Sequence, residues 1–138
     1  MRFMMLMIPE GYENARADKV PDAEAVAAMM KYNEELRKAG VLLSLDGLHP
    51  PSDGARISFA NGKATVTPGP FAGVKEALGG YWMINVKSKK VAIEWASRIP
   101  VTDRSVVEVR QVFEMDEFPE DVQAAAGDFP ERMKAATR

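Results

Sequence analysis

Residues 79–100 read GGYWMINVKSKKVAIEWASRIP, and this stretch predicts a strand with two different faces followed directly by an amphipathic helix. Side chains of a strand point alternately to opposite faces, and the apolar face here consists of Trp82, Ile84 and Val86. Ser88 is a favourable N-cap residue for the helix, which Pro100 ends. The core-facing positions of the helix are Ala92, Trp95, Ala96 and Ile99. The stretch therefore predicts a sheet with helices packed on one side.

The same order of strand and helix is predicted for the N-terminal third of the chain. Residues 2–8 are apolar at both parities, which is typical of a central strand covered on both faces. Asp22 is a suitable N-cap for a helix of about five turns, and Gly40 is placed to end it. The apolar positions of this helix are Val26, Met29, Met30 and Leu36. Residues 41–48 are rich in branched apolar side chains and predict the next strand.

A hairpin and a last strand complete the pattern. Residues 55–59 and 63–67 alternate in polarity on either side of Asn61-Gly62, the strongest local turn signal in the chain. Residues 105–113 predict the last strand. Its apolar face consists of Val107, Val109 and Phe113. Its polar face carries Glu108 and Arg110.

The order of these elements favours an α+β fold of ferredoxin-like type, a split βαβ plan with an extra hairpin. Right-handed crossovers place both helices on one face of such a sheet. The other face carries Tyr81, Met83, Glu108 and Arg110. This surface is too rich in apolar groups to remain in water, so we expect a second copy to cover it in a two-fold homodimer with a barrel-like interface. We expect this domain to span residues 1–113, with an acidic, alanine-rich C-terminal helix or tail at residues 114–138.

Composition excludes several classes of function. The chain of 138 residues has no cysteine, which excludes disulfides and thiolate catalysis, and with one histidine we expect no metal and no bound cofactor. A net charge of −2 without a Lys/Arg cluster argues against nucleic acid as a partner. The apolar run at residues 3–8 is too short for a membrane span or a signal peptide. We therefore expect a cytoplasmic protein that does not bind membranes.

Several linked motifs resemble those of a known family. Residues 67–81 read TPGPFAGVKEALGGY. The other matching segments are AIEWASRIP at 92–100, VEVR at 107–110, AGVL at 39–42 and DGLHP at 46–50. Over residues 4–112 the chain thus resembles the YCII-related proteins, in particular their DGPF-type branch, whose core reads roughly DGPFAETKE followed by a Gly-Gly-aromatic strand. The resemblance implies a dimeric α/β barrel related to the ferredoxin-like fold.

Two positions depart from the family motif. Pro68 stands where these proteins have aspartate, and Gly73-Val74 replace the usual acidic-threonine pair. In YCII-related proteins a His and an Asp have been proposed as a catalytic pair, so the resemblance implies enzymatic activity. In this chain, however, Pro68 removes the carboxylate of the motif. By family association the resemblance also implies an alternative function, a non-catalytic interaction module associated with a sigma-factor-like regulator.

His49 is the candidate catalytic residue, because it is the one histidine and lies in a proline-flanked loop after a predicted strand. Asp46 and Asp53 are close in sequence, and either could orient the imidazole for general acid/base catalysis on a small organic substrate. The alternative is an exposed loop histidine that contacts only water.

Glu108 and Arg110 share one face of the last strand, so they could line a pocket for a small polar or anionic ligand. The alternative is an ion pair across the dimer interface. Tyr81 and Met83 lie on the same face of the sheet, either as ligand contacts or as part of a dimer core. We therefore expect a homodimeric domain that binds a small ligand.

Overall fold

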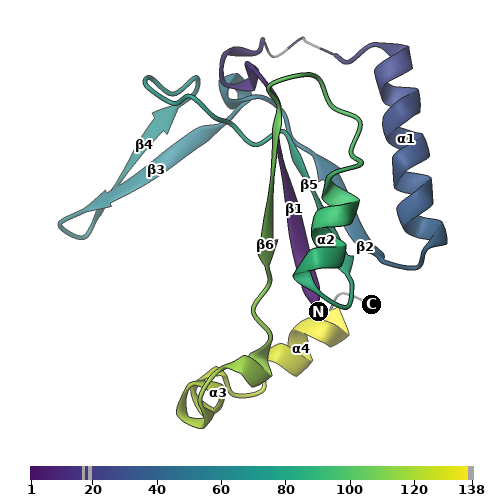
Figure 1. Cartoon of the computed structure of the whole chain (residues 1–138). Coiled ribbons are helices and arrows are strands. Elements are labelled where there is room, and N and C mark those ends of the chain that lie inside the picture. Colours follow the sequence, from purple (N-terminus) through teal and green to yellow (C-terminus); the bar gives the residue numbers. More distant parts are fainter. Residues whose placement is uncertain (17, 19, 137–138) are drawn as a thin grey trace.

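The main sheet has four antiparallel strands in the order β2-β5-β1-β6 (Figure 1). In the computed structural model, which describes residues 1–16, 18 and 20–136, these strands are β1 (Arg2–Ile8), β2 (Leu42–Gly47), β5 (Gly80–Asn85) and β6 (Val106–Gln111). β1 lies between β5 and β6, as its apolar sequence predicts. The predicted α+β class is confirmed, and the strand order is consistent with a ferredoxin-like fold.

Helices α1 (Ala23–Lys38) and α2 (Lys89–Ala96) pack on one face of the main sheet, and the core lies between helices and strands. The alternation predicted for β5 is confirmed, because Trp82 and Ile84 are buried in this core. The buried hydrophobic residues are Phe3, Met5, Met7, Tyr32, Leu36, Trp82, Ile84, Val86, Ala92 and Ile99. Each large side chain buried there stabilises the domain by about 1.5–3 kcal/mol.

α1 begins and ends as predicted, but its buried stripe differs from the prediction. The Asp22 carboxylate accepts a hydrogen bond from the backbone N–H of Ala25 at 2.7 Å, and Gly40 follows the helix with a φ of 74°. Val26 and Met30, which the apolar pattern includes, are exposed. The buried stripe consists of Met29, Tyr32, Asn33 and Leu36.

Two polar groups set the rotation of α1 about its axis. The Tyr32 hydroxyl donates to the Trp95 carbonyl oxygen at 2.7 Å, and the Trp82 indole N–H donates to the Asn33 side-chain oxygen at 2.8 Å. A buried polar group without a partner costs about 1–3 kcal/mol, so both bonds favour this rotation over one that buries Val26. Hydrophobic periodicity does not contain this information, because it counts asparagine only as a polar residue.

The predicted hairpin is confirmed as β3 (Ala55–Ala60) and β4 (Lys63–Pro68). Asn61 and Gly62 form its turn, with φ values of 52° and 77°, as a type I′ turn requires of both central residues. The two strands form a sheet of their own and project from the rest of the molecule (Figure 1). We call this hairpin, residues 55–68, the arm.

The chain after β6 departs from the predicted strand at Phe113. The sequence places this side chain on the apolar face of the last strand with Val107 and Val109, but it is 72% exposed, and its ring contacts Phe118 at a centroid distance of 5.0 Å. The strand ends here because β1 begins at Arg2 and offers no pairing partner beyond it. The helices α3 (Glu120–Ala126) and α4 (Phe129–Ala136) follow, and neither contains a buried residue. The predicted division of the chain at residue 113 stays a prediction. Among the described residues, no helix has the length and hydropathy to cross a membrane.

Candidate ligand-binding face

The face of the main sheet opposite α1 and α2 brings together residues from all four strands. Strand register places Asp46, Tyr81, Leu6 and Glu108 in one row, and Ser44, Met83, Met4 and Arg110 in the next. We call these eight residues the open face. The four residues that the sequence indicates as ligand-binding, from β5 and β6, therefore lie in two adjacent rows of this face.

The centre of the open face is apolar, and its two edges are polar. Met4, Leu6 and Met83 come from the central strands β1 and β5 and are half-buried. Asp46 belongs to the edge strand β2, whereas Glu108 and Arg110 belong to the opposite edge strand β6. An apolar floor with a few polar groups at its rim is the usual composition of a small-molecule site.

Tyr81 and Asp46 form a hydrogen-bonded pair on the open face. The Tyr81 hydroxyl donates to Oδ2 of Asp46 at 2.9 Å. This hydrogen bond, together with the negative charge of Asp46, raises the pKa of the Tyr81 phenol above its usual value of 10.0. The phenol therefore remains protonated at neutral pH and acts as a hydrogen-bond donor.

Glu108 and Arg110 form an ion pair within one strand. Nη1 of Arg110 lies 3.1 Å from Oε2 of Glu108, and both side chains are largely exposed. Exposed pairs of this kind contribute little to stability, because water screens the charges. Both groups thus remain available to a ligand or to another chain.

The structure pairs His49 with Asp53 rather than with Asp46. Nδ1 of His49 lies 2.8 Å from Oδ2 of Asp53, across the short 3₁₀ turn Pro51–Asp53, while Asp46 bonds to Tyr81. Asp53 can therefore orient the imidazole, as the sequence allows for either carboxylate. The His49 side chain is 82% exposed, so water reaches this pair freely in a single chain.

Tyr12 is a neighbour of this pair that no sequence signal indicated. Its hydroxyl donates to the carbonyl oxygen of Leu48, next to His49. Burial raises the pKa of Tyr12, and the Asp53 carboxylate raises it further. Tyr12 reaches this loop because Gly79 lacks a side chain: a Cβ there would lie 2.6 Å from the Pro9 ring and 3.5 Å from the Tyr12 ring.

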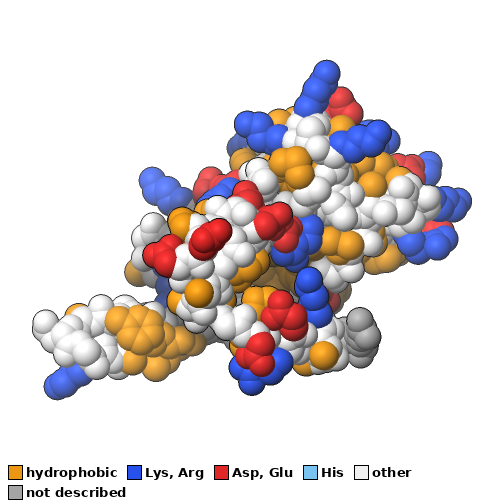
Figure 2. Space-filling model, turned by 90° about the horizontal axis from the view of Figure 1, so that it is seen from below, with side chains coloured by type: hydrophobic (Ala, Val, Ile, Leu, Met, Phe, Trp, Pro, Cys, Tyr) orange, Lys and Arg blue, Asp and Glu red, His pale blue; other side chains and the backbone are white. Residues whose placement is uncertain are grey.

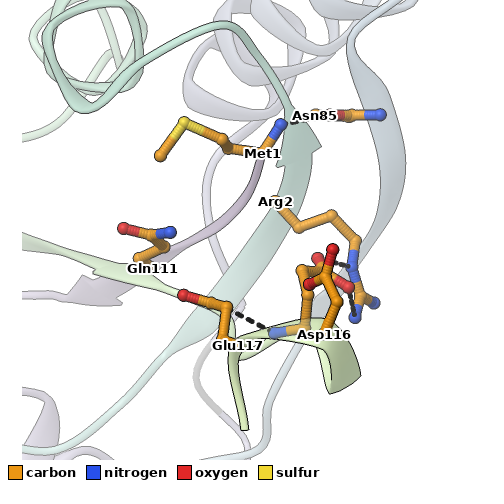
Figure 3. A pocket seen from close by; sticks show the side chains of 7 residues that line it. Met1, Arg2, Asn85, Gln111, Asp116 and Glu117 are labelled. Atoms are coloured by element: carbon orange, nitrogen blue, oxygen red, sulfur yellow. Dashed lines mark hydrogen bonds and ion pairs between the residues drawn. The ribbon is translucent and has the colours of Figure 1, made fainter.

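A hollow of about 540 Å³ lies elsewhere, at the end of the open face where β1 begins (Figure 3). Its lining residues are Met1, Arg2, Asn85, Gln111, Glu114, Asp116 and Glu117. Arg2 is already engaged there, with Nε 2.7 Å from Oε1 of Glu114 and Nη2 3.1 Å from Oε2. The bidentate bond lowers the pKa of Glu114, so this hollow offers little attraction to an anion. None of the site residues indicated by the sequence lines it.

Among the described residues, no group of three or more His, Asp or Glu side chains could hold a metal ion. The antiparallel sheet with two helices on one face defines an α+β domain of the class described above. The chain belongs to the YCII-related domain family, whose model matches residues 1–116. A search of the curated proteins finds no match. The family resemblance is therefore confirmed, whereas membership of the DGPF-type branch stays a prediction.

Proposed function

We propose that this chain works as a homodimer that binds a small polar organic molecule on the open face. The observation that carries this proposal is the row formed by Asp46, Tyr81, Leu6 and Glu108. It presents a phenol held in place by Asp46, two carboxylates and an apolar contact in one line, and the phenol oxygen can accept a hydrogen bond from a ligand. Arg110 in the next row supplies a cation, so the face can bind a ligand that carries both an acidic and a polar group.

A second copy would complete this site by covering the open face. The open face alone is a surface without walls, and ligand sites usually bury most of the surface of the ligand. Two open faces stacked about a two-fold axis would enclose the apolar floor, as expected for the barrel-like dimer inferred from the sequence. Enclosure would also remove Glu108 and Arg110 from water, which strengthens their interaction with a ligand.

Catalysis, if the bound molecule is turned over, falls to His49 with Asp53 as its orienting partner. The 2.8 Å contact fixes one ring nitrogen and leaves the other free to exchange a proton with substrate. His49→Ala would then lower the turnover rate by about 10²–10⁴. Turnover unchanged in that variant would remove His49 from the mechanism.

Thermal shift with a panel of small carboxylic acids, amides and lactones tests the binding proposal. A molecule that binds only the native state raises the melting temperature. We expect Arg110→Ala and Glu108→Gln to abolish the shift. Arg37→Ala and Glu34→Gln are matched controls, because they alter a Glu-Arg pair on the exposed surface of α1. Equal shifts in all four variants would contradict binding at the open face.

The interaction module remains a second candidate, and a specific observation favours it. Pro68 pairs with Ala55 in the arm and brings no carboxylate to the His49 loop. Within the described part of the chain, the exposed His49 contacts Asp53 and receives no carboxylate from the arm. Absence of any thermal shift across the panel, in a protein that is folded and dimeric, would favour this candidate over ligand binding.

A further inference from the structure

The surface of this chain is too large for a protein that works alone. Its accessible surface is 10198 Å². A compact monomer of 15.2 kDa would expose roughly 7,100 Å². The excess of roughly 3,000 Å² is well above the ~800 Å² that each partner buries in a standard interface. A partner is therefore needed to cover it.

The arm is one part of this excess, and it has the pattern of a sheet that packs on a core. All residues of β3 and β4 are exposed. One face is apolar throughout, with the register pairs Ala55 and Pro68, Ile57 and Val66, and Phe59 and Ala64. The other face is polar, with the register pairs Arg56 and Thr67, and Ser58 and Thr65. Such alternation is typical of a sheet with one covered face (hydrophobic side chains gather along the projecting hairpin in Figure 2).

An isolated two-stranded hairpin is marginally stable in water, so the arm needs a surface to pack against. Phe59 is 78% exposed and Val66 is 64% exposed in the single chain. The charges of the arm are Arg56 and Lys63, with no acidic residue between 54 and 75. Both cations lie on the polar face, because Arg56 pairs with Thr67 and Lys63 pairs with Ala60, so the surface that receives the apolar face should be apolar.

The C-terminal part of the chain offers such a surface. Residues 114–131 contain seven acidic residues and no Lys or Arg, and we call them the acidic segment. Exposed large apolar side chains lie within it or beside it, namely Phe113, Val122 and Phe129. Its apolar groups can therefore pack on the apolar face of the arm, whereas its carboxylates can pair with Arg56 and Lys63 only around the edge of the hairpin.

Within one chain, the arm and the acidic segment leave the sheet at opposite ends. The arm is attached where β2 ends and β5 begins, because Gly47 pairs with Gly80. The acidic segment follows the end of β6, where Gln111 pairs with Phe3 near the start of β1. A two-fold axis that reverses the strand direction places the arm end of one copy beside the acidic segment of the other. Six residues of strand span roughly 20 Å, so each strand of the arm is about as long as the strands of the main sheet along which it must reach.

We infer that the arm of each copy docks its apolar face on the acidic segment of a second copy, in a reciprocal exchange. This inference rests on the homodimer of the proposed function and adds a second contact to it. The arm begins two positions after Asp53, so the exchange would also fix the loop that holds His49.

Sedimentation equilibrium of arm variants tests the inference. Ile57→Thr, Phe59→Thr and Val66→Thr combined keep strand propensity but remove the apolar contact, and should raise the dimer Kd at least about tenfold. Thr65→Ser combined with Thr67→Ser on the polar face is the matched control, and should leave the Kd unchanged. Near-ultraviolet circular dichroism of the buried Trp82 verifies that each variant is folded. An unchanged Kd in the triple variant would overturn the inference.

Photo-cross-linking identifies the receiving surface directly. The chain has no cysteine, so Ala64→Cys carries a benzophenone at one position, beside Phe59 on the apolar face. The benzophenone-labelled chain is mixed with ¹⁵N-enriched chains that carry no benzophenone. It should cross-link to ¹⁵N peptides from residues 113–131. Cross-links within the same chain only, to another surface, or to nothing would contradict the inference.

Met83→Glu separates this inference from the proposed function, because Met83 lies on the open face and outside the arm. If Met83→Glu dissociates the dimer and the triple arm variant does not, the arm exchange is wrong and the stacked dimer stands. A wild-type chain that is monomeric at ~100 μM would overturn both, since an obligate interface of this size binds far more tightly. If the wild-type chain is a dimer whose arms cross-link as expected but binds no molecule of the panel, only the proposed ligand site is overturned.

Discussion

At the scale of single residues, the alternation of side chains along a strand is the signal that the sequence carries most clearly. Because the period of a strand is two, Trp82 and Tyr81 had to point to opposite faces, and the structure confirms this. The partner of His49 could not be obtained in this way. Its contact with Asp53 depends on the 3₁₀ turn Pro51–Asp53, a local geometry that spacing alone does not specify.

The pKa of Tyr81 should fall toward 10.0 in Asp46→Asn, because the carboxylate that accepts its proton raises this pKa. The pKa of Tyr81 is higher in the folded than in the unfolded chain, so the protonated phenol stabilises the fold. This contribution to folding stability is complete below pH 10 and is lost as the pH rises through the folded pKa. ¹³C NMR of the tyrosine Cζ atoms over an alkaline titration measures the change. Asp53→Asn is the control: it should lower the pKa of Tyr12 and leave that of Tyr81 in place. An unaltered Tyr81 titration in Asp46→Asn would contradict the hydrogen bond.

Asn33→Ala should destabilise the domain by about 1–3 kcal/mol, because it leaves the buried indole N–H of Trp82 without an acceptor. Lys31→Ala, on an exposed position of the same helix, should change the free energy of unfolding by less than about 0.5 kcal/mol. Urea denaturation followed by tryptophan fluorescence compares the variants. Equal stabilities would show that water replaces the Asn33 oxygen.

At the scale of elements, the sequence identified strands and helices better than their packing. The Asn61-Gly62 turn predicts the hairpin because the local signal is complete within the residues of the turn. That β3 and β4 form a separate sheet depends on contacts distant in sequence, which no local pattern encodes. The rotation of α1 was missed for a similar reason, since it depends on the partners of Tyr32 and Asn33 on other elements.

Pairing of β2 with β5 depends on Gly80, where a Cβ would lie 2.8 Å from the backbone oxygen of Asp46. Gly80→Ala should therefore push the strands apart and cost about 1–3 kcal/mol in the free energy of unfolding. Gly54→Ala is a matched control, since its Cβ would be 3.5 Å from the nearest atom and its φ of −113° suits alanine. Chemical denaturation measures both variants. A Gly80→Ala protein as stable as Gly54→Ala would show that the strands adjust without cost.

At the scale of the whole molecule, the core of the single chain buries only part of its apolar side chains. The sheet, α1 and α2 form a core that the sequence largely predicts, because amphipathic patterns report burial within a chain. The arm and the helices after β6 have apolar residues that the single chain leaves exposed. A sequence pattern does not show where a strand loses its pairing partner, which is why the sequence groups Phe113 with Val107 and Val109 although β6 ends at Gln111.

The attachment of the C-terminal segment to the sheet should depend on pH through Glu114. Arg2 donates two hydrogen bonds to this carboxylate and holds its pKa below the usual 4.5. The resulting stabilisation, less than about 1 kcal/mol for a pair this exposed, is present above pH 4.5 and is lost as the pH falls through the folded pKa. Glu114→Gln should therefore speed amide hydrogen exchange at residues 115–117 relative to wild type at pH 7. The two proteins should converge once the pH falls below the folded pKa of Glu114, because the wild-type carboxyl is then protonated and as uncharged as the amide of the variant, whereas Glu131→Gln should match wild type throughout. A difference that persists at acid pH would mean that Glu114 holds the segment by packing instead of by charge.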